Sequence, residues 1–423
     1  ADWLRLERAR PRTVVRERSG RHVALFAWAL PPNSMAGVYR PLSFMRYGCQ
    51  LGWRIDAFCG EPRSEQRQHG EELLSRVPDD VTLRAIPRST RQPSYRFFPP
   101  VDGGFTNALA FARHATATLE KDPPDVVLAS GPPFSMFVAA FLVARRFGVP
   151  LVLDYRDEWT ECPFDFVNKD GNDRAWERRC LSAADAVLFT TESHLRHQLA
   201  TFRELAASKA HVVPNGWEPE DFVDRRDDRR MLTANGAATL RIAHVGNLAG
   251  HTPPFDFLSS LYQLLTDEPS WVPRIRVQFI GRRSSTADAA IRNFEFSGVI
   301  EVIDHVGKRD ANRHMQGSDA LLLLASTDLE RYLPGKLFDY LAARRPVLVF
   351  GSRGESASLV DRLGAGVFCP SGSGSALRDA IARLQDFDMS RNTNTVSEWL
   401  HEHRREALAE RAFTIVESVA SHA

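Results

Sequence analysis

The sequence predicts an α/β protein built from two doubly wound, Rossmann-like domains, each a parallel sheet with helices on both faces. Three observations support this fold class. The chain has 423 residues, which exceeds one ordinary core and suits two domains of roughly 200 residues each. Short apolar runs alternate with longer amphipathic stretches, as is typical of strand–helix units in a parallel sheet. The alternation also begins afresh after a dense run of charges at residues 224–230.

The first half contains six runs that we expect to be strands. They are short and largely apolar, as strands covered on both faces should be. Their ranges are 22–28, 54–58, 125–129, 150–155, 186–190 and 211–213. Residues 1–21 are rich in arginine and lack the apolar core of a secretory signal, so we interpret them as a solvated terminus.

The second half repeats the pattern with six further runs. Their ranges are 240–245, 276–280, 300–303, 320–324, 346–350 and 366–368. The charged segment between the halves is interpreted as a solvated linker rather than a nucleic-acid contact. In open α/β sheets, ligands bind beyond the carboxyl ends of the strands, so two such domains facing one another predict a cleft with one half-site each. A two-substrate transferase and a hinged binding protein both fit this arrangement.

Charge and cysteine content exclude several classes of protein. The 54 Lys and Arg residues against 53 Asp and Glu give a net charge of +1, which offers no bulk field for nucleic acid. The five cysteines are odd in number and form no C-x-x-C pair, which argues against a disulfide framework and a structural zinc site and indicates a reducing compartment. No run reaches the 18 apolar residues of a membrane span, and the nearest, 134–147, contains two arginines. We therefore expect a cytoplasmic protein.

Residues 332–346 (YLPGKLFDYLAARRP) carry the most informative chemistry. Pro334 and Gly335 predict a turn, after which a helix begins with Lys336 in its first turn and Asp339 on the same face. A helix N-terminus with a lysine suits a pyrophosphate, and a carboxylate one turn deeper suits the hydroxyls of a ribose. An ordinary solvated ion pair between these two residues is the alternative interpretation.

This segment resembles the PGK-L-x-E-Y-L-A-x-x-x-P-V stretch of GT-B glycosyltransferases, particularly glycosyltransferase family 4. Further landmarks of that family follow one another in order along nearly the whole chain. They are Pro31-Pro32 with Gly37 and Arg40, PDVVLASGPP at 124–133, DYRDEW at 154–159, ADAV at 184–187, VPNG at 213–216, HVGNL at 244–248 and GSDA at 317–320.

The resemblance implies a GT-B architecture of three parts. Residues 1–222 would form the acceptor-binding domain and residues 223–396 the nucleotide-sugar-binding domain. Residues 397–423, which have the apolar pattern of an amphipathic helix, would pack back on the first domain.

The resemblance also implies a donor site in the second domain. Gly335 and Lys336 match the position that holds the diphosphate, and Asp339 matches the carboxylate that holds the ribose. Gly246 and Asn247 end the first strand of this domain. Because glycine has no side chain, the backbone there could come close to the phosphates; a plain strand-to-helix turn is the alternative. The weaker candidates of the same kind are Gly281 and Arg282.

Two departures from the family pattern bear on this site. Many members carry two glutamates eight positions apart, but with Asp339 as the second the first falls at Arg331, next to Glu330. The basic residue usually found after the Gly246 loop is also not evident, and His251 or the arginines after Gly281 would have to supply its charge. The sugar contacts and the retaining or inverting course therefore stay open.

Asp157 is the predicted catalytic carboxylate of the first domain. It follows an apolar strand, so it should project into the cleft, where a carboxylate can accept the acceptor's proton or stabilise a cationic sugar. The alternative is a structural pair with Arg156. Gly37, Arg40 and Arg156 are predicted to border the same cleft and to hold acceptor or phosphate, with a polar surface loop as the alternative for residues 33–40.

No metal or other cofactor is expected. His194 and His197 are three positions apart on a predicted helix, but no third ligand is suitably spaced. The chain also lacks a strand-terminal D-x-D of the kind that metal-dependent sugar transferases use.

The sequence thus predicts a glycosyltransferase that moves a sugar from a UDP- or GDP-sugar to an acceptor hydroxyl. A lipid-linked saccharide of cell-surface polysaccharide or glycolipid synthesis is the favoured acceptor, handled at the inner membrane face. The habits of the resembled family and the arginines and aromatic residues at 91–98 support it, with a buried loop as the alternative for that segment. A soluble metabolite or natural product as acceptor, a nucleotide-sugar epimerase of the same fold and a two-lobed binding protein are the alternatives. The sugar, the base and the oligomeric state stay open.

Overall fold

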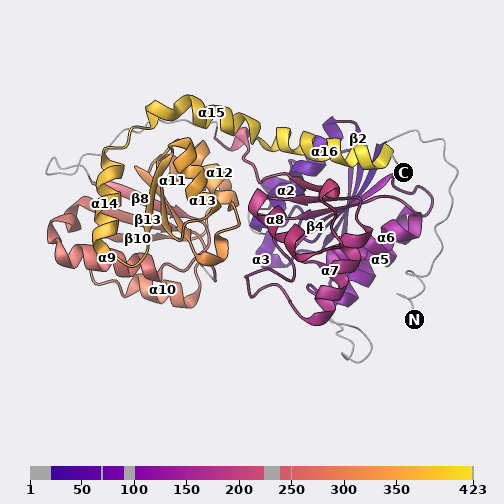
Figure 1. The fold of residues 1–423 in the computed structure, drawn as a ribbon, viewed down its shortest axis with the longest axis horizontal. Coiled ribbons are helices and arrows are strands. Elements are labelled where there is room, and N and C mark those ends of the chain that lie inside the picture. Colours follow the sequence, from indigo (N-terminus) through magenta and orange to yellow (C-terminus); the bar gives the residue numbers. More distant parts are fainter. Residues whose placement is uncertain (1–20, 68–69, 90–100, 223–238, 249, 422–423) are drawn as a thin grey trace. The chain divides into compact units, whose positions relative to one another are not determined.

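The computed structural model describes residues 21–67, 70–89, 101–222, 239–248 and 250–421. The chain forms two compact units, each a parallel sheet flanked by helices (Figure 1). One unit comprises Ala1–Pro214 and Arg405–Ala423, and the other comprises Asn215–Arg404. The predicted fold class is confirmed. The arginine-rich start, the segment 91–98 and the charged run 224–230 lie outside the described residues.

The sheet of the first unit has seven parallel strands in the order β3-β2-β1-β4-β5-β6-β7. They are β1 (Arg21–Ala27), β2 (Trp53–Gly60), β3 (Val81–Ile86), β4 (Val126–Gly131), β5 (Leu151–Tyr155), β6 (Ala186–Phe189) and β7 (Ala210–Val212). Six of these strands were predicted, and β3 was not. As an edge strand β3 is only partly buried, so it alternates polar and apolar residues and lacks the continuous apolar run of its neighbours.

Helices cover both faces of this sheet. They are α2 (Tyr39–Gln50), α3 (Ser64–Arg67), α4 (Glu71–Leu74), α5 (Phe105–Leu119), α6 (Ser135–Phe147), α7 (Gly171–Ala183), α8 (Glu192–Thr201) and α16 (Arg405–Ser421). Helix α6 is apolar and buried over most of its length because it packs between the sheet and its neighbouring helices. Within the described ranges, no helix combines the length and the apolar character that crossing a membrane requires.

The second unit has six parallel strands in the order β10-β9-β8-β11-β12-β13. They are β8 (Leu240–Val245), β9 (Ile275–Ile280), β10 (Ile300–Ile303), β11 (Ala320–Ala325), β12 (Val347–Gly351) and β13 (Gly366–Pro370). Its helices are α9 (Phe255–Asp267), α10 (Ser285–Arg292), α11 (Lys308–Gln316), α12 (Gly335–Ala342), α13 (Glu355–Leu363), α14 (Gly374–Gln385) and α15 (Thr393–Glu402). Each of the six strands was predicted from its apolar run.

The C-terminal region is two helices and not one. Helix α15 belongs to the second unit, where Val396 and Leu400 are buried in the core. Helix α16 belongs to the first unit and packs on α2, with the ring of Phe413 5.7 Å from that of Trp53. The return to the first unit therefore begins at Arg405, eight positions after the predicted boundary at residue 397.

The passage from the first unit to the second also lies eight positions from the predicted boundary, at Pro214–Asn215 instead of 222–223. Trp217 explains the difference. Its indole N–H donates to the carbonyl of Leu400 (2.7 Å), and its backbone N–H donates to the carbonyl of His403 (3.2 Å). These bonds tie the segment after Pro214 to the end of α15, within the second unit.

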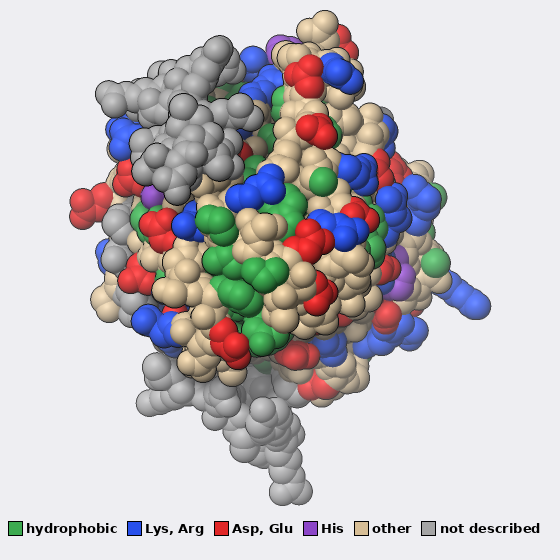
Figure 2. All heavy atoms as spheres, turned by 90° about the vertical axis from the view of Figure 1, so that its left-hand side faces the viewer, with side chains coloured by type: hydrophobic (Ala, Val, Ile, Leu, Met, Phe, Trp, Pro, Cys, Tyr) green, Lys and Arg blue, Asp and Glu red, His purple; other side chains and the backbone are tan. Residues whose placement is uncertain are grey.

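Hydrophobic side chains gather on the face of the second unit that carries α9 and α10 (Figure 2). Phe255 and Tyr262 of α9 are 44% and 39% exposed, and the ring of Tyr262 lies 5.6 Å from that of Phe296. Phe296 in turn packs against the buried core of this unit. The patch is therefore the outer edge of that core.

Candidate active site

The predicted acid of the first unit lies just beyond the carboxyl end of β5. Asp157 is half-buried, and its carboxylate makes no hydrogen bond or ion pair with any residue in the described part of the chain. Burial raises the pKa of Asp157 to about 6; Arg156 opposes this rise, while Glu158 and Asp154 add to it. A carboxylate with a pKa near neutrality can exchange a proton with a substrate hydroxyl at physiological pH.

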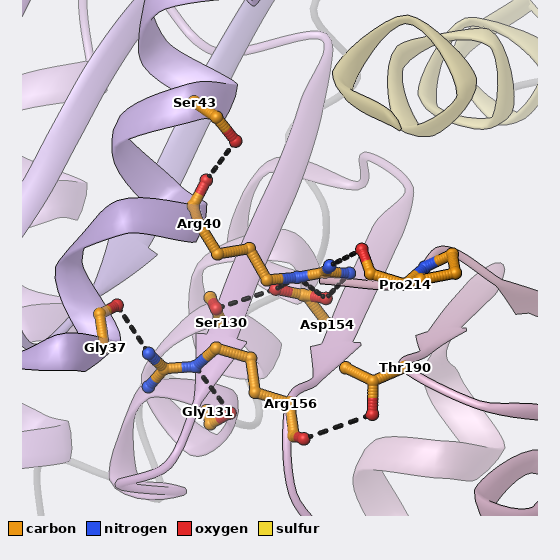
Figure 3. A network of polar contacts seen from close by, with 9 residues as sticks. All are labelled: Gly37, Arg40, Ser43, Ser130, Gly131, Asp154, Arg156, Thr190 and Pro214. Atoms are coloured by element: carbon orange, nitrogen blue, oxygen red, sulfur yellow. Dashed lines mark hydrogen bonds and ion pairs between the residues drawn. The ribbon is translucent and has the colours of Figure 1, made fainter. Parts of the chain in front are cut away.

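Arg40 binds a carboxylate and a backbone carbonyl of the first unit. Its Nε lies 3.0 Å from both carboxylate oxygens of Asp154, and a terminal nitrogen lies 2.7 Å from Oδ1. The other terminal nitrogen donates to the carbonyl of Pro214 (2.7 Å), and the Ser130 hydroxyl donates to Asp154 Oδ2 (2.7 Å; Figure 3). This buried network joins α2, β4, β5 and the end of the first unit's main segment.

Arg156 is also engaged within the first unit. Its Nε donates to the carbonyl of Gly131 (3.0 Å), and one terminal nitrogen donates to that of Gly37 (2.6 Å; Figure 3). The other terminal nitrogen donates to the carbonyl of Pro132. A Cβ at residue 37 would lie 2.5 Å from the Arg156 guanidinium, which explains a glycine there. Both guanidiniums bind groups of the first unit, and the acceptor-side role of Gly37, Arg40 and Arg156 stays a prediction. The proposed Arg156–Asp157 hydrogen-bonded pair is not formed.

Two buried carboxylates that the sequence analysis did not select fix the segment around Asp157. Glu177 accepts hydrogen bonds from the backbone N–H (3.0 Å) and the hydroxyl of Thr160. Asp173 accepts from the indole N–H of Trp159 at 2.9 Å. Burial raises the pKa of each carboxyl to about 7. Both residues are on α7, so this helix holds the two residues that follow Asp157 and Glu158.

In the second unit, Gly246 and Gly281 directly follow the neighbouring strands β8 and β9. Their φ angles are +138° and +129°, values that favour glycine. The N–H of Gly246 donates to the carbonyl of Ile280 (2.8 Å), and a Cβ at residue 281 would lie 2.5 Å from the carbonyl oxygen of Gly246. A side chain at residue 281 would therefore meet the backbone of the neighbouring strand end, whereas a Cβ at residue 246 would meet the end of the Lys336 side chain.

Lys336 is in the first turn of α12, and its side chain lies beside Gly246. Its Nζ lies 2.9 Å from the position that a Cβ of Gly246 would occupy and 3.3 Å from Nε2 of His244. Burial lowers the pKa of Lys336 to about 8. The predicted diphosphate residues Gly246, Gly281 and Lys336 are thus brought together. Gly335 starts the same helix, and a Cβ there would have no neighbour within 4 Å.

Asp339 pairs with Lys308 of α11 and not with Lys336. The Lys308 Nζ lies 2.5 Å from Asp339 Oδ2, and both side chains are 13% exposed. Oδ1 of Asp339 is buried without a hydrogen-bond partner among the described residues. The alternative of a solvated Lys336–Asp339 pair is therefore not observed. Lys308 lies in the helix that follows β10 and carries no sequence signal that marks it as a partner of Asp339.

The remaining donor candidates are at the surface. Asn247 and Arg282 are exposed. Arg283 is largely buried and binds Asp288 (2.9 Å) and Asp304 (2.6 Å), so its charge is balanced within the unit. The carboxylate of Glu330, one position from where the first family glutamate would fall, accepts a hydrogen bond from Ser352 (2.7 Å).

No three His, Cys, Asp or Glu side chains within the described ranges are grouped so as to hold a metal ion. His194 is fully buried, and its ring lies 4.9 Å from that of Phe189. His197 lies 3.7 Å from the carboxylate of Glu161. The two histidines of α8 therefore serve packing and a salt bridge.

Comparison with known proteins finds one matching family model and several similar solved structures. Residues 36–216 match the model of the glycosyl transferase 4-like domain. No curated protein sequence matches the chain. Three of the similar solved structures are sucrose-phosphate synthase from Thermosynechococcus elongatus, HepE from Anabaena in complex with UDP and glucose, and WaaG, a glycosyltransferase involved in lipopolysaccharide biosynthesis.

The sucrose-phosphate synthase has a TM-score of 0.72 and 13% identity, with 95% of this chain and 100% of that chain covered. HepE has a TM-score of 0.66 and 11% identity, covering 94% and 100%. WaaG has a TM-score of 0.63 and 14% identity, covering 92% and 98%. The TM-scores and coverages establish a shared fold over nearly the whole length, at low sequence identity. The chain therefore shares the GT-B fold of these structures, and its residues 36–216 match the glycosyl transferase 4-like domain.

Proposed function

We propose that the protein transfers a sugar from a UDP- or GDP-sugar to an acceptor hydroxyl and that its second unit holds the donor. The observation that carries this proposal is the position of Lys336, whose half-buried ammonium lies against the glycine pair at the ends of β8 and β9. A lysine ammonium beside two glycines suits a diphosphate, because the phosphate oxygens can approach both the positive charge and the backbone N–H groups. HepE, which shares the fold, was solved with UDP and glucose.

In this proposal Asp339 holds the ribose. Its Oδ2 is fixed by Lys308, and its Oδ1 is buried without a hydrogen-bond partner among the described residues, so a movement that exposes Oδ1 would let it accept from a ribose hydroxyl. Gly335 lets the start of α12 approach the phosphates, and the exposed side chains of Asn247 and Arg282 would contact the donor from the loops after β8 and β9.

Asp157 would be the catalytic carboxylate. As the acceptor oxygen bonds to the anomeric carbon and the bond from that carbon to the diphosphate breaks, the carboxylate accepts the hydroxyl proton or stabilises the positive charge on the sugar. The nucleoside diphosphate leaves with the electron pair of the broken bond, and Lys336 balances the charge that develops on it. We propose that this reaction needs no metal ion, because a lysine ammonium supplies the positive charge.

The acceptor that we propose is a lipid-linked saccharide of cell-surface polysaccharide or glycolipid synthesis, glycosylated at the cytoplasmic face of the membrane. The structural likeness to WaaG, which is involved in lipopolysaccharide biosynthesis, supports this choice. The likeness to sucrose-phosphate synthase supports a soluble acceptor as the second candidate. Transfer of a labelled sugar to a membrane lipid extract or to a water-soluble metabolite pool distinguishes the two.

Calorimetric titration with UDP, GDP and their common sugars tests the donor site. We expect wild-type protein to bind one nucleotide selectively and Lys336→Ala to bind it at least about tenfold more weakly, the equivalent of one charge-assisted hydrogen bond. Lys121→Ala, which removes an exposed lysine of the first unit, is the matched control. Selective binding that survives Lys336→Ala would place the diphosphate elsewhere, and failure of folded protein to bind any nucleotide would reject the proposed donor.

A further inference from the structure

His244 is a fully buried residue of β8, two positions before Gly246. Both nitrogens of its ring have a partner. Nδ1 lies 3.0 Å from the carbonyl oxygen of Leu322 on β11, and Nε2 lies 3.3 Å from Nζ of Lys336. His244 opens the HVGNL landmark at 244–248, but the sequence analysis gave it no role, because a histidine within an apolar strand is most often a core residue.

The contact with Leu322 indicates the tautomer of the ring, and the backbone of Asn247 is a further hydrogen-bond partner of the imidazole. A carbonyl oxygen only accepts hydrogen bonds, so Nδ1 carries the proton and donates to Leu322. Nε2 of the neutral ring then has a lone pair, which accepts a hydrogen bond from the Lys336 ammonium. Burial and the nearby Lys336 charge hold the pKa of His244 well below its usual range, which agrees with a neutral ring.

His244 is the hydrogen-bond partner of Lys336 within the described part of the chain. An ammonium has three N–H donors, so one donor is directed at His244 and two remain for other acceptors. The position of the ammonium beside Gly246 therefore depends on an acceptor that carries no charge. A carboxylate in place of the imidazole would neutralise Lys336, whereas a neutral imidazole orients the lysine and leaves its full positive charge.

We propose that His244 is a positioning residue of the donor site, which holds the Lys336 ammonium against the Gly246–Gly281 edge through a neutral imidazole acceptor. This inference rests on the proposed donor function of Lys336. It assigns to His244 an effect on nucleotide binding that is exerted through the lysine, with no direct contact to the nucleotide.

The test is a double-mutant cycle for UDP and GDP binding, measured by calorimetry on wild type, His244→Leu, Lys336→Ala and the double variant. We expect His244→Leu to weaken binding of the preferred nucleotide about tenfold, the equivalent of one hydrogen bond. The double variant should bind no more weakly than Lys336→Ala, because the two side chains act as one unit. His244→Gln, whose side-chain oxygen is a neutral acceptor, should bind within about threefold of wild type.

If His244 served packing alone, His244→Leu would weaken nucleotide binding equally with and without Lys336. His244→Gln would then not restore the affinity of wild type. Wild-type affinity in folded His244→Leu, together with lost affinity in Lys336→Ala, would overturn the role of His244 and leave the donor site in place. If wild-type protein binds neither nucleotide, the donor proposal and this inference both fail. Nitrogen-15 NMR of labelled histidine in wild-type protein is independent of any folding defect, and a proton on Nε2 would also overturn the inference.

Discussion

At Gly246, both the backbone conformation and the proposed approach of a diphosphate favour a residue without a side chain. Its φ of +138° disfavours any other residue, and a Cβ would lie 2.9 Å from Lys336 Nζ. We expect Gly246→Ala to lower the free energy of unfolding by about 1–3 kcal/mol and to weaken nucleotide binding by displacing the lysine. Gly171→Ala, at an unstrained helix position with no neighbour within 4 Å, should change neither binding nor stability by more than about 1 kcal/mol. Denaturation and calorimetry of both variants provide the measurements, and unchanged nucleotide affinity in Gly246→Ala would contradict the site.

Asp157 determines the expected pH dependence of transfer. With a pKa of about 6, its carboxylate is mostly protonated at pH 5 and mostly ionised at pH 7, so kcat/KM should rise over this interval and level off above it. We expect Asp157→Asn to lower kcat/KM by about 10²–10⁴-fold and to remove this rise. The control is Asp165→Asn, at an exposed position of the same loop. A rate profile in Asp157→Asn that still rises through pH 6 would assign the titration to another group.

At the scale of elements, the Arg40–Asp154 network joins α2, β4 and β5. Removal of the arginine leaves Asp154 buried without its counter-charge. We therefore expect Arg40→Ala to lower the free energy of unfolding by about 3–5 kcal/mol, and Ser130→Ala by about 1–3 kcal/mol. Arg282→Ala, which truncates an exposed arginine, should stay within about 0.5 kcal/mol of wild type in urea denaturation. A stable Arg40→Ala protein that fails only in acceptor binding would support the acceptor-side role that we predicted.

Strands were easier to predict from the sequence than the hydrogen-bond and ion-pair partners of side chains, for a physical reason. A strand covered on both faces must be apolar throughout, so β8 and β11 are visible in composition, whereas the half-exposed edge strand β3 is not. A side-chain partner leaves no such trace. Arg40 and Asp154 are 114 positions apart, and Lys308 and Asp339 are 31 apart. Only the fold brings them together, so motif spacing could not predict the Arg40–Asp154 and Lys308–Asp339 pairs.

At the scale of the whole molecule, the carboxyls of Asp173 and Glu177 link stability to pH. Their pKa values are raised by burial from 3.8 and 4.5 to about 7, so between these values the folded protein binds more protons than the unfolded chain. Their contribution to stability is full below about pH 4 and is lost as the pH rises through about 7. The maximum slope is about 1.4 kcal/mol per pH unit for each group.

Glu177→Gln isolates this effect, because it removes one of the two titrations and keeps a similar shape. Amide hydrogen exchange of α7, compared between variant and wild type at each pH from 5 to 8, reports on the first unit alone. We expect wild-type protection, corrected for the intrinsic exchange rate, to fall with pH more steeply than that of Glu177→Gln. Parallel profiles would mean that Glu177 stays ionised in the folded protein throughout this range.

The place of α16 has a consequence for the order in which the protein is made. The 190 residues Asn215–Arg404 of the second unit are translated between the two segments of the first. Phe413 and Val416 of α16 share one core with Val23 and Leu128, so that core lacks part of its packing until α16 has left the ribosome. The second unit is continuous and can fold as soon as it emerges. On the ribosome, the second unit can thus be completed before the first. The core of the first unit stays partly packed until α16 has been translated.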